Sequence, residues 1–347
     1  MNVAVFGASG HTGSFVVAEL LRRDHSPLAI GRDPVKIAAC RHDVEKKVAS
    51  LDDPESLDRA LRGMQAVINC AGPFLDSSKP LIEAALSAGI HYADVTAEQE
   101  SARLTLESFD TAARRRNVAI LPAAGFFGGL GDLLATAAMG DWKHADRIDI
   151  AIALDSWWPT TGTRLTGVRN TIPRVVRAGG NFTPLQSSSP KIWTFREPFK
   201  TQEVVEVPLT ETILISAHLN VLEVHNYINQ APLRDLSDVA TPTPVAADEL
   251  GRSNQVFEID VVVRNGSEER RVRARGRDIY AVTAPIVVEA AERFGEDGFH
   301  RAGTFALGDL FDATEFLHAL TVKGDLIVET DFNKTVASGN LRVSGSA

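Results

Sequence analysis

The chain is predicted to be an α/β protein: a doubly wound parallel sheet with a second, mixed or antiparallel α/β domain inserted into it. Three observations predict this. Short apolar runs alternate with helical patterns through the first 140 residues, which is typical of a parallel sheet covered by helices on both faces. The strand-like runs are almost continuously apolar, as burial on both faces requires. Near Asp146 the pattern changes to alternation, which favours a mixed or antiparallel sheet.

The first region divides into six predicted strands with helices between them. Each strand is a short run rich in valine, isoleucine, leucine or alanine, and a turn or cap residue separates it from the next helix. The strands are expected at 3–6, 27–30, 47–49, 66–70, 91–95 and 118–121. The helices are expected at 12–23, from 34 onward, at 53–62 with Asp53 as N-cap, at 79–88, and between the last two strands.

The second region contains the strongest turn signal of the chain. Asn265-Gly266 separates strand patterns at 255–264 and 268–275, and an Asn-Gly pair supplies the positive φ angles of a type I′ hairpin. Further strands are expected at 146–154, 203–207, 211–215 and 219–224, with a helix at 164–178. Helices at 279–294 and 312–320 are expected to return to the first domain. The predicted domains are therefore 1–140 plus 279–347, and 141–278.

Composition excludes several classes of protein. A net charge of −9 over 347 residues argues against a nucleic-acid partner, because phosphate binding needs a basic surface. Two cysteines, Cys40 and Cys70, are too few for a disulfide framework, and no ligand cluster predicts a metal site. The apolar stretch 118–140 contains Pro122, several glycines and Asp132, so no membrane span is expected. The N-terminus runs directly into a strand without a signal peptide, which predicts a cytoplasmic protein.

The most specific motif predicts a dinucleotide site. After the first strand come Gly7, Gly10 and Gly13, separated by Ala8, Ser9, His11 and Thr12. This Rossmann-type turn needs glycine for the tight bend, for approach of the backbone to a pyrophosphate, and for close packing of helix on strand. The helix that follows offers its free N–H groups to the phosphates. We therefore expect Gly7, Ser9, Gly10, His11, Thr12 and Gly13 to contact the cofactor.

The end of the second strand distinguishes NADP from NAD. Arg32 stands where an NAD enzyme carries an acidic residue, and a guanidinium can pair with a 2′-phosphate, so NADP(H) is favoured over NAD. Asp33 is the counter-argument, because its carboxylate could bind the ribose hydroxyls instead. Asp52 is expected beside the adenine or as a helix cap. Cys70, Ala71, Gly72 and Pro73 end the fourth strand and are expected to pass the nicotinamide ribose, Cys70 as a small buried residue.

Several motifs together resemble the saccharopine dehydrogenase-like oxidoreductases, a group that includes saccharopine reductases and trans-acting enoyl reductases. The resemblance rests on stretches at both ends of the chain: 7–13, Gly31-Arg32, 69–74, 91–94, 124–126 with Gly131-Asp132, 276–280 with Thr283-Ala284, and 302–305. It implies an NADP-binding Rossmann domain and an inserted α/β domain that mediates homodimerisation. Residues 95–98 and 126–129 depart from the pattern of the group, and both lie on the expected substrate side.

The proton donor is not apparent from the sequence. Tyr92 and Asp94 end the fifth strand, at the edge of the sheet where ligands bind. Asp132 is either a catalytic acid or a helix N-cap. Arg169 is either a ligand for a substrate carboxylate or a surface residue, and Tyr227, with His225, forms either an acid pair or a buried structural pair. Short-chain dehydrogenase chemistry is excluded because no lysine follows Tyr92, Tyr227 or Tyr280 by four residues.

Two functions from different classes remain. The first is an NADP-dependent oxidoreductase that transfers hydride between NADPH and a C=N, C=C or C=O group of a small-molecule substrate. The second is a non-catalytic NADP-binding regulatory or interaction protein, since a fold alone never establishes catalysis. Phe126, Phe127, Trp157 and Trp158 favour an apolar substrate channel, whereas imine reduction of the saccharopine type predicts cationic residues at the pocket. The sequence leaves three locations possible for Trp157 and Trp158: a pocket wall, the core or a dimer interface.

Overall fold

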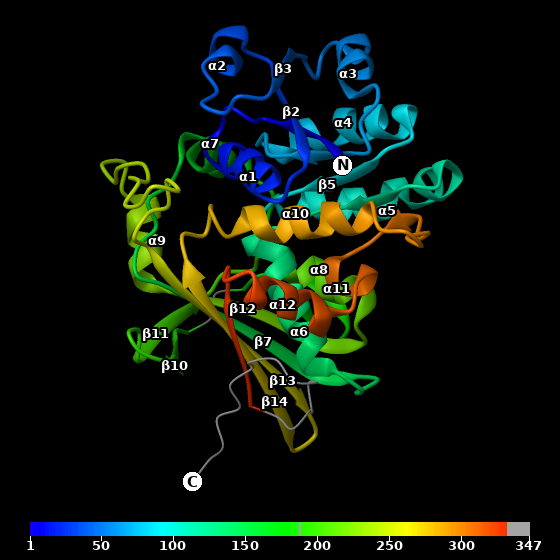
Figure 1. Ribbon diagram of the computed structural model, residues 1–347. Coiled ribbons are helices and arrows are strands. Elements are labelled where there is room, and N and C mark those ends of the chain that lie inside the picture. The colour runs from blue at the N-terminus through cyan, green and yellow to red at the C-terminus, as the bar shows by residue number, and fades with distance from the viewer. Residues whose placement is uncertain (187–188, 332–347) are drawn as a thin grey trace.

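Two sheets, joined by a shared helical layer, make up the structure (Figure 1). This computed structural model describes residues 1–186 and 189–331. The N-terminal sheet is drawn in blue and cyan, the second sheet in green and yellow, and helix α10 (Thr283–Phe294) crosses between them. The predicted α/β class, with a parallel sheet and a second mixed sheet, is confirmed.

The first sheet is parallel and has seven strands. Its order is β15 (Gly303–Thr304), β6 (Ala119–Leu121), β5 (His91–Asp94), β4 (Ala66–Asn69), β1 (Asn2–Phe6), β2 (Ser26–Gly31) and β3 (Glu45–Val48). The chain winds from β1 outward to β3, then returns to β4 on the other side of β1. A crevice therefore opens above the carboxyl ends of β1 and β4, where the strand order reverses.

Helices cover both faces of this sheet. The helices connecting its strands are α1 (His11–Arg22), α2 (Pro34–Ala38), α3 (Pro54–Leu61), α4 (Phe74–Ala88) and α5 (Gln99–Arg116). Alternate residues of β1 enter different cores: Val3 and Val5 pack with α1 and α10, whereas Ala4 and Phe6 pack with α3 and α4. Burial on both faces explains why the strands read as continuous apolar runs.

The second sheet is mixed and larger. Its main path is β10 (Lys191–Thr194), β11 (Thr201–Glu206), β12 (Val221–Asn229), β7 (Ala145–Leu154), β13 (Val256–Asn265), β14 (Glu268–Arg277) and β16 (Ile327–Thr330). Strands β8 (Val175–Ala178) and β9 (Asn181–Pro184) join at β12. The predicted β13–β14 hairpin is present, but its two-residue turn is Gly266-Ser267 and not Asn265-Gly266: Asn265 ends β13 paired with Glu268, and of the predicted pair only Gly266 has a positive φ. Ile148, Ile150 and Ile152 of β7 all face the main core.

A continuous apolar core joins the sheets. It runs from α1 and α10 through α6 (Gly131–Met139) to the inner face of β7 and β13. Further members of this layer are the turn η1 (Phe126–Leu130), α8 (Thr210–His218), α11 (Leu307–Leu310) and α12 (Ala313–Val322). Asp312 caps α12 by accepting from Glu315 N at 2.8 Å, as its sequence pattern predicted.

Two predicted elements are wrong. The apolar run 211–215 is part of helix α8, not a strand; the helix is buried almost all round, so it lacks the polar stripe that would reveal a helical period. The predicted helix 164–178 ends early, as α7 (Thr161–Arg169), and its last part is strand β8. Gly179 and Gly180, both with positive φ, form the two-residue turn between β8 and β9.

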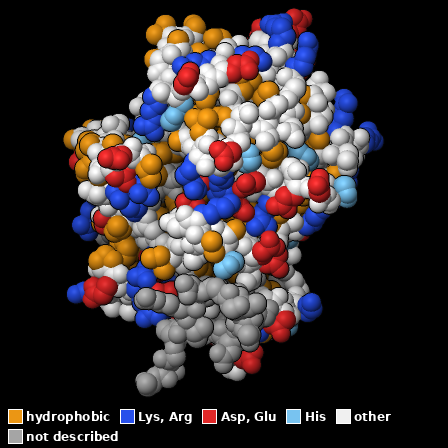
Figure 2. All heavy atoms as spheres, in the orientation of Figure 1, with side chains coloured by type: hydrophobic (Ala, Val, Ile, Leu, Met, Phe, Trp, Pro, Cys, Tyr) orange, Lys and Arg blue, Asp and Glu red, His pale blue; other side chains and the backbone are white. Residues whose placement is uncertain are grey.

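The C-terminal part of the chain serves both sheets. Helix α10 and strand β15 return to the first sheet as expected, but α12 packs on α6 and β16 pairs with β14 of the second sheet. Residues 332–347, which the predicted boundary also includes, lie outside the described residues. No helix within 1–186 and 189–331 is long and apolar enough to cross a membrane. On the face shown in Figure 2, basic and acidic side chains are interspersed.

Candidate functional site

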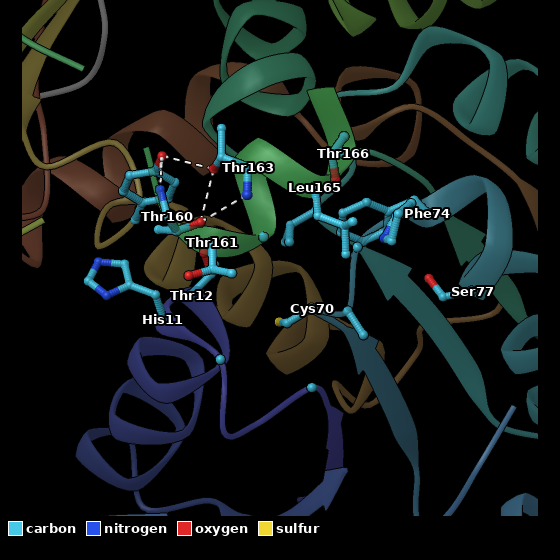
Figure 3. Close-up of a pocket in the computed structure, with 18 of the residues that line it drawn as sticks. His11, Thr12, Cys70, Phe74, Ser77, Thr160, Thr161, Thr163, Leu165 and Thr166 are labelled. Atoms are coloured by element: carbon cyan, nitrogen blue, oxygen red, sulfur yellow. Dashed lines mark hydrogen bonds between the residues drawn. The ribbon is translucent and has the colours of Figure 1, made fainter. Parts of the chain in front are cut away.

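A cavity of about 920 Å³ opens above the carboxyl ends of β1, β2 and β4. The glycine turn after β1 and the turn after β4 form its floor. Helix α7, which comes from the inserted region, lies over it, with its N-cap Thr160 above Thr12 (Figure 3). This is the position where doubly wound sheets bind dinucleotides.

The glycine turn leaves no room for side chains. Gly7 has φ +84°, and a Cβ there would lie 3.0 Å from the backbone nitrogen of Ala71. A Cβ on Gly13 would lie 2.2 Å from the carbonyl oxygen of Gly7, because α1 packs directly on the turn. Both positions therefore require glycine: Gly7 for the tight bend, and Gly13 for the close packing of helix α1 on the turn.

The start of α1 is open to an anion. Its N-cap, Gly10, makes no side-chain hydrogen bond to the first turn, and that turn holds no acidic residue. The N–H groups at this end keep their capacity to bind phosphate. Five predicted cofactor contacts line the cavity here: Gly7, Ser9, Gly10, His11 and Thr12. Gly13 does not line it and acts through packing. The turn thus fits a dinucleotide pyrophosphate.

The end of β2 favours a 2′-phosphate. Arg32 lines the cavity with an exposed side chain, and Lys36 of α2 adds a second cation that the sequence analysis missed. Asp33 also lines the cavity, but its Oδ1 accepts from Val35 N at 2.9 Å and Lys36 N at 3.1 Å as the N-cap of α2. This capping explains why an acidic residue stands beside Arg32.

On the adenine side the predicted residue does not line the cavity, whereas on the nicotinamide side all four predicted residues do. Asp52 is exposed and does not line the cavity; Leu51 lines it instead, and Asp53 caps α3. Cys70, Ala71, Gly72 and Pro73 all line it. Burial, reinforced by the charge of Asp94, raises the pKa of the Cys70 thiol, so Cys70 stays protonated and is not a nucleophile.

Tyr92 and Asp94 lie behind the cavity wall. Both are fully buried, and Tyr92 Oη donates to Asp94 Oδ2 at 2.9 Å. The other carboxylate oxygen accepts from Thr96 N at 3.0 Å and Ala123 N at 2.8 Å. Burial raises the pKa of Asp94 to about 6 despite these bonds. The pair holds together the chain segments that follow β5 and β6, and neither residue is among those that line the cavity.

Asp132 and Tyr227 also lie away from the cavity. Asp132 Oδ1 is 2.7 Å from His218 Nε2, and its Oδ2 accepts from Gly308 N, so it joins α6, α8 and α11. Burial alone would lower the pKa of His218, but the Asp132 charge and hydrogen bond outweigh it and raise the value. Tyr227 Oη accepts from Arg147 Nη2 at 2.9 Å and Lys191 Nζ at 2.6 Å on the second sheet.

The inner wall of the cavity is aromatic. Phe126, Phe127 and Trp157 line it, and the rings of Phe127 and Trp157 are stacked with centroids 5.1 Å apart. Trp158, their neighbour in sequence, points outward and is 37% exposed. Arg169 lines the rim, where its Nη2 lies 2.7 Å from Asp76 Oδ2. Its charge is thus neutralised by another residue of the rim.

A hydroxyl cluster that the sequence analysis missed lies on the roof. Tyr280 Oη is 2.9 Å from Thr163 Oγ1, accepts from Trp157 Nε1 at 3.0 Å, and lies 3.4 Å from Thr160 N. A tight turn presents this tyrosine: Asp278, at φ +54°, accepts from the backbone nitrogens of Tyr280 and Ala281. In the sequence, Tyr280 stands out only as part of the stretch 276–280, which resembles the saccharopine dehydrogenase-like oxidoreductases.

Comparison with known proteins agrees with this geometry. Residues 3–121 match the family model described as the saccharopine dehydrogenase NADP-binding domain. Among curated relatives, a probable mitochondrial saccharopine dehydrogenase-like oxidoreductase of Arabidopsis thaliana is 30% identical over 143 residues, and a trans-acting enoyl reductase of Mycobacterium ulcerans is 28% identical over 133. Each match covers 36% of this chain and 32% of the relative, so the matched segment spans about a third of these proteins.

The whole architecture resembles one solved enzyme. Saccharopine dehydrogenase (L-Glu forming) from Saccharomyces cerevisiae superposes with a TM-score of 0.66 at 12% identity, covering 95% of this chain and 99% of that one. At this identity the likeness shows the fold alone. The match of residues 3–121 to the NADP-binding domain of the saccharopine dehydrogenase family confirms the resemblance and the cofactor expected from the sequence.

Proposed function

We propose that this chain, which carries the NADP-binding domain of the saccharopine dehydrogenase family, is an NADPH-dependent reductase of an uncharged, apolar substrate with a polarised C=C or C=O bond. The observation that carries the proposal is the wall of the cavity beyond the glycine turn. Phe126, Phe127 and Trp157 form it, and its one arginine, Arg169, is already paired with Asp76. Among the described residues of this wall, a dicarboxylate imine would therefore meet no unpaired cation.

The chain's own residues supply binding and orientation. Arg32 and Lys36 would hold the 2′-phosphate, the open start of α1 the pyrophosphate, and residues 70–73 the nicotinamide ribose. When bound, NADPH supplies the hydride. The stacked pair Phe127 and Trp157 would place a flat apolar substrate against it and exclude water. An open cavity of this size, rather than a filled one, supports an enzyme over a purely regulatory protein.

The test is a paired substrate assay. Purified protein is first titrated with NADPH and NADH by nicotinamide fluorescence. Oxidation of NADPH is then followed with benzylideneacetone, an uncharged aromatic enone, and separately with 2-oxoglutarate plus lysine, a charged imine-forming pair. Turnover of the enone alone is the expected result. NADPH binding with faster turnover of the charged pair would refute the apolar assignment, and no turnover of either would favour a regulatory protein.

Dimerisation and the domain boundary at 141–278 remain part of this proposal. The inserted region supplies both the roof of the cavity, α7, and every strand of the second sheet except β16. Sedimentation of the full chain at micromolar concentration tests for the homodimer, and a monomer would contradict it.

A further inference from the structure

The hydroxyl groups of Tyr280, Thr163 and Thr160 form a hydrogen-bonded series on the roof of the cavity. The neighbouring N–H groups determine which hydroxyl donates to which. Tyr280 Oη accepts from Trp157 Nε1 at 3.0 Å and from Thr160 N at 3.4 Å. Both are N–H groups and can only donate, so they occupy the acceptor sites of the phenol oxygen. The phenol hydrogen must therefore donate to its remaining partner, Thr163 Oγ1, at 2.9 Å.

The same reasoning gives the donor and the acceptor in the next bond of the hydroxyl series, between Thr163 and Thr160. Thr163 Oγ1 takes the phenol hydrogen and gives its own to Thr160 Oγ1, 3.0 Å away. Thr160 Oγ1 also accepts from Thr163 N at 3.0 Å, as the N-cap of α7. With both lone pairs in use, its own hydrogen remains available to donate. Figure 3 shows the Thr160 side chain above Thr12, on the wall of the cavity.

We propose that Thr160 is the proton donor of this enzyme and that Tyr280, acting through Thr163, is the source of the proton. The inference rests on the proposed reductase function and adds the group that the reaction still lacks. The acids that the sequence offered as candidates, Tyr92, Asp94, Asp132 and Tyr227, do not line the cavity.

The step balances in atoms and charge. As one atom of the substrate double bond accepts the hydride supplied by NADPH, the other atom takes the proton of Thr160, and the Thr160 O–H bond breaks. Thr160 is restored by the hydrogen of Thr163, and Thr163 by that of Tyr280. The negative charge ends on the phenol oxygen, where the Trp157 and Thr160 N–H groups stabilise it until water returns the proton.

The environment of Tyr280 keeps its phenol protonated until the reaction draws the proton away. Burial raises its pKa, so the phenol holds its proton at neutral pH, while the N–H groups of Trp157 and Thr160 oppose the rise because they stabilise the phenolate. His11, whose ring meets that of Tyr280 edge-on at 5.3 Å, does not compete, because burial lowers its pKa and keeps the ring neutral. The one charge near both is Asp278, which accepts backbone N–H groups and fixes the turn.

The experiment separates a donor from a helix cap. Thr160→Ser keeps both the hydroxyl and the cap, whereas Thr160→Asn keeps a capping oxygen but has no hydroxyl. With benzylideneacetone as the probe, kcat of Thr160→Asn should fall about 100-fold or more, a usual cost of losing a general acid. Thr160→Ser should stay within about 3-fold of the wild type, and both variants should keep NADPH affinity and melting temperature.

Thr163→Val and Tyr280→Phe test the links behind the donor. Each should lower kcat without changing NADPH affinity, and the solvent deuterium isotope effect should change in both. Thr161→Val is the matched control, because Thr161 also lines the cavity at the start of α7 but belongs to no bond of the cluster. Wild-type rates in Thr160→Asn or Tyr280→Phe would overturn the proposal.

A second readout does not depend on turnover. In protein labelled with ¹³C-tyrosine, the Cζ resonance of Tyr280 is assigned by its loss in Tyr280→Phe. Thr163→Val removes the acceptor of the phenol hydrogen, so this resonance should shift, while Thr161→Val should leave it in place. An unchanged resonance in Thr163→Val would overturn the hydrogen-bond chain. If the shift occurs but wild-type protein reduces neither probe, the reductase proposal fails and the geometry stands.

Discussion

Glu211 gives the sharpest test of the physical reasoning, because its carboxyl group is fully buried beneath the loop that carries the aromatic wall. Its Oε1 accepts from Gly128 N at 2.8 Å, and its Oε2 has no hydrogen-bond partner. Burial raises its pKa to about 7, and the neighbouring Asp132 charge adds to the effect. The Glu211→Gln variant keeps the shape and the bond to Gly128 but cannot ionise.

The size of the effect follows from linkage. The folded pKa of Glu211, about 7, lies above the ordinary value of 4.5 by about 2.5 pH units. A carboxyl group with a raised pKa stabilises the fold fully below pH 4.5, and this advantage is lost as pH rises to 7. At 1.4 kcal/mol per unit, the wild type should lose about 3 kcal/mol of unfolding free energy across that window because of this residue alone.

The assay is urea unfolding of both proteins between pH 4.5 and 8. The difference in unfolding free energy between variant and wild type reports on Glu211, because His218 titrates in both proteins. The variant should gain relative stability from pH 5 to pH 8. Near pH 5 it should be slightly less stable, since its amide leaves a donor unpaired. A difference that stays constant with pH would refute the reasoning.

Three further predictions follow from the site and its supports. Arg32→Ala should weaken NADPH binding about 10- to 100-fold, the worth of a charge-assisted pair, and leave NADH binding nearly unchanged in fluorescence titrations; equal losses would refute the phosphate assignment. Gly13→Ala should lower the unfolding free energy by about 1–3 kcal/mol and abolish NADPH binding, because the new Cβ meets a carbonyl oxygen at 2.2 Å. The control is Gly167→Ala, which should do neither because the space around Gly167 is open. His218 should titrate above its usual pKa of 6.5 by proton NMR in the wild type and below it in Asp132→Asn, where burial lowers the pKa and only the smaller effect of the Asp309 charge opposes it; the pair with Asp132 therefore stabilises the fold below pH 6.5 and less as pH rises through the folded pKa.

Local chemistry made much of the first sheet predictable. Gly7 and Gly13 are required by the turn itself, and the β13–β14 hairpin turns at a residue with positive φ, Gly266. Arg32 could be placed because it follows directly on a strand end. Each of these features depends on a few neighbouring residues, so the sequence pattern carries the full signal.

Long-range packing decided what the sequence could not. Helix α8 was predicted as a strand because burial from every side removes the periodicity on which the distinction depends. Tyr92 and Asp94 end a strand at the ligand edge, yet both are buried, with Tyr92 bonded to Asn69 at the end of β4 and Asp94 to Ser78 of α4.

The sequence by itself determined the sheet, the dinucleotide turn and the cofactor, because these follow from backbone requirements of adjacent residues. Only the tertiary structure decided which side chains face the cavity. Tyr280 and Thr163 are 117 residues apart and meet only because α7 lies over the first sheet. Such a contact depends on how two sheets and a shared core fit together, and no pattern within a single segment encodes it.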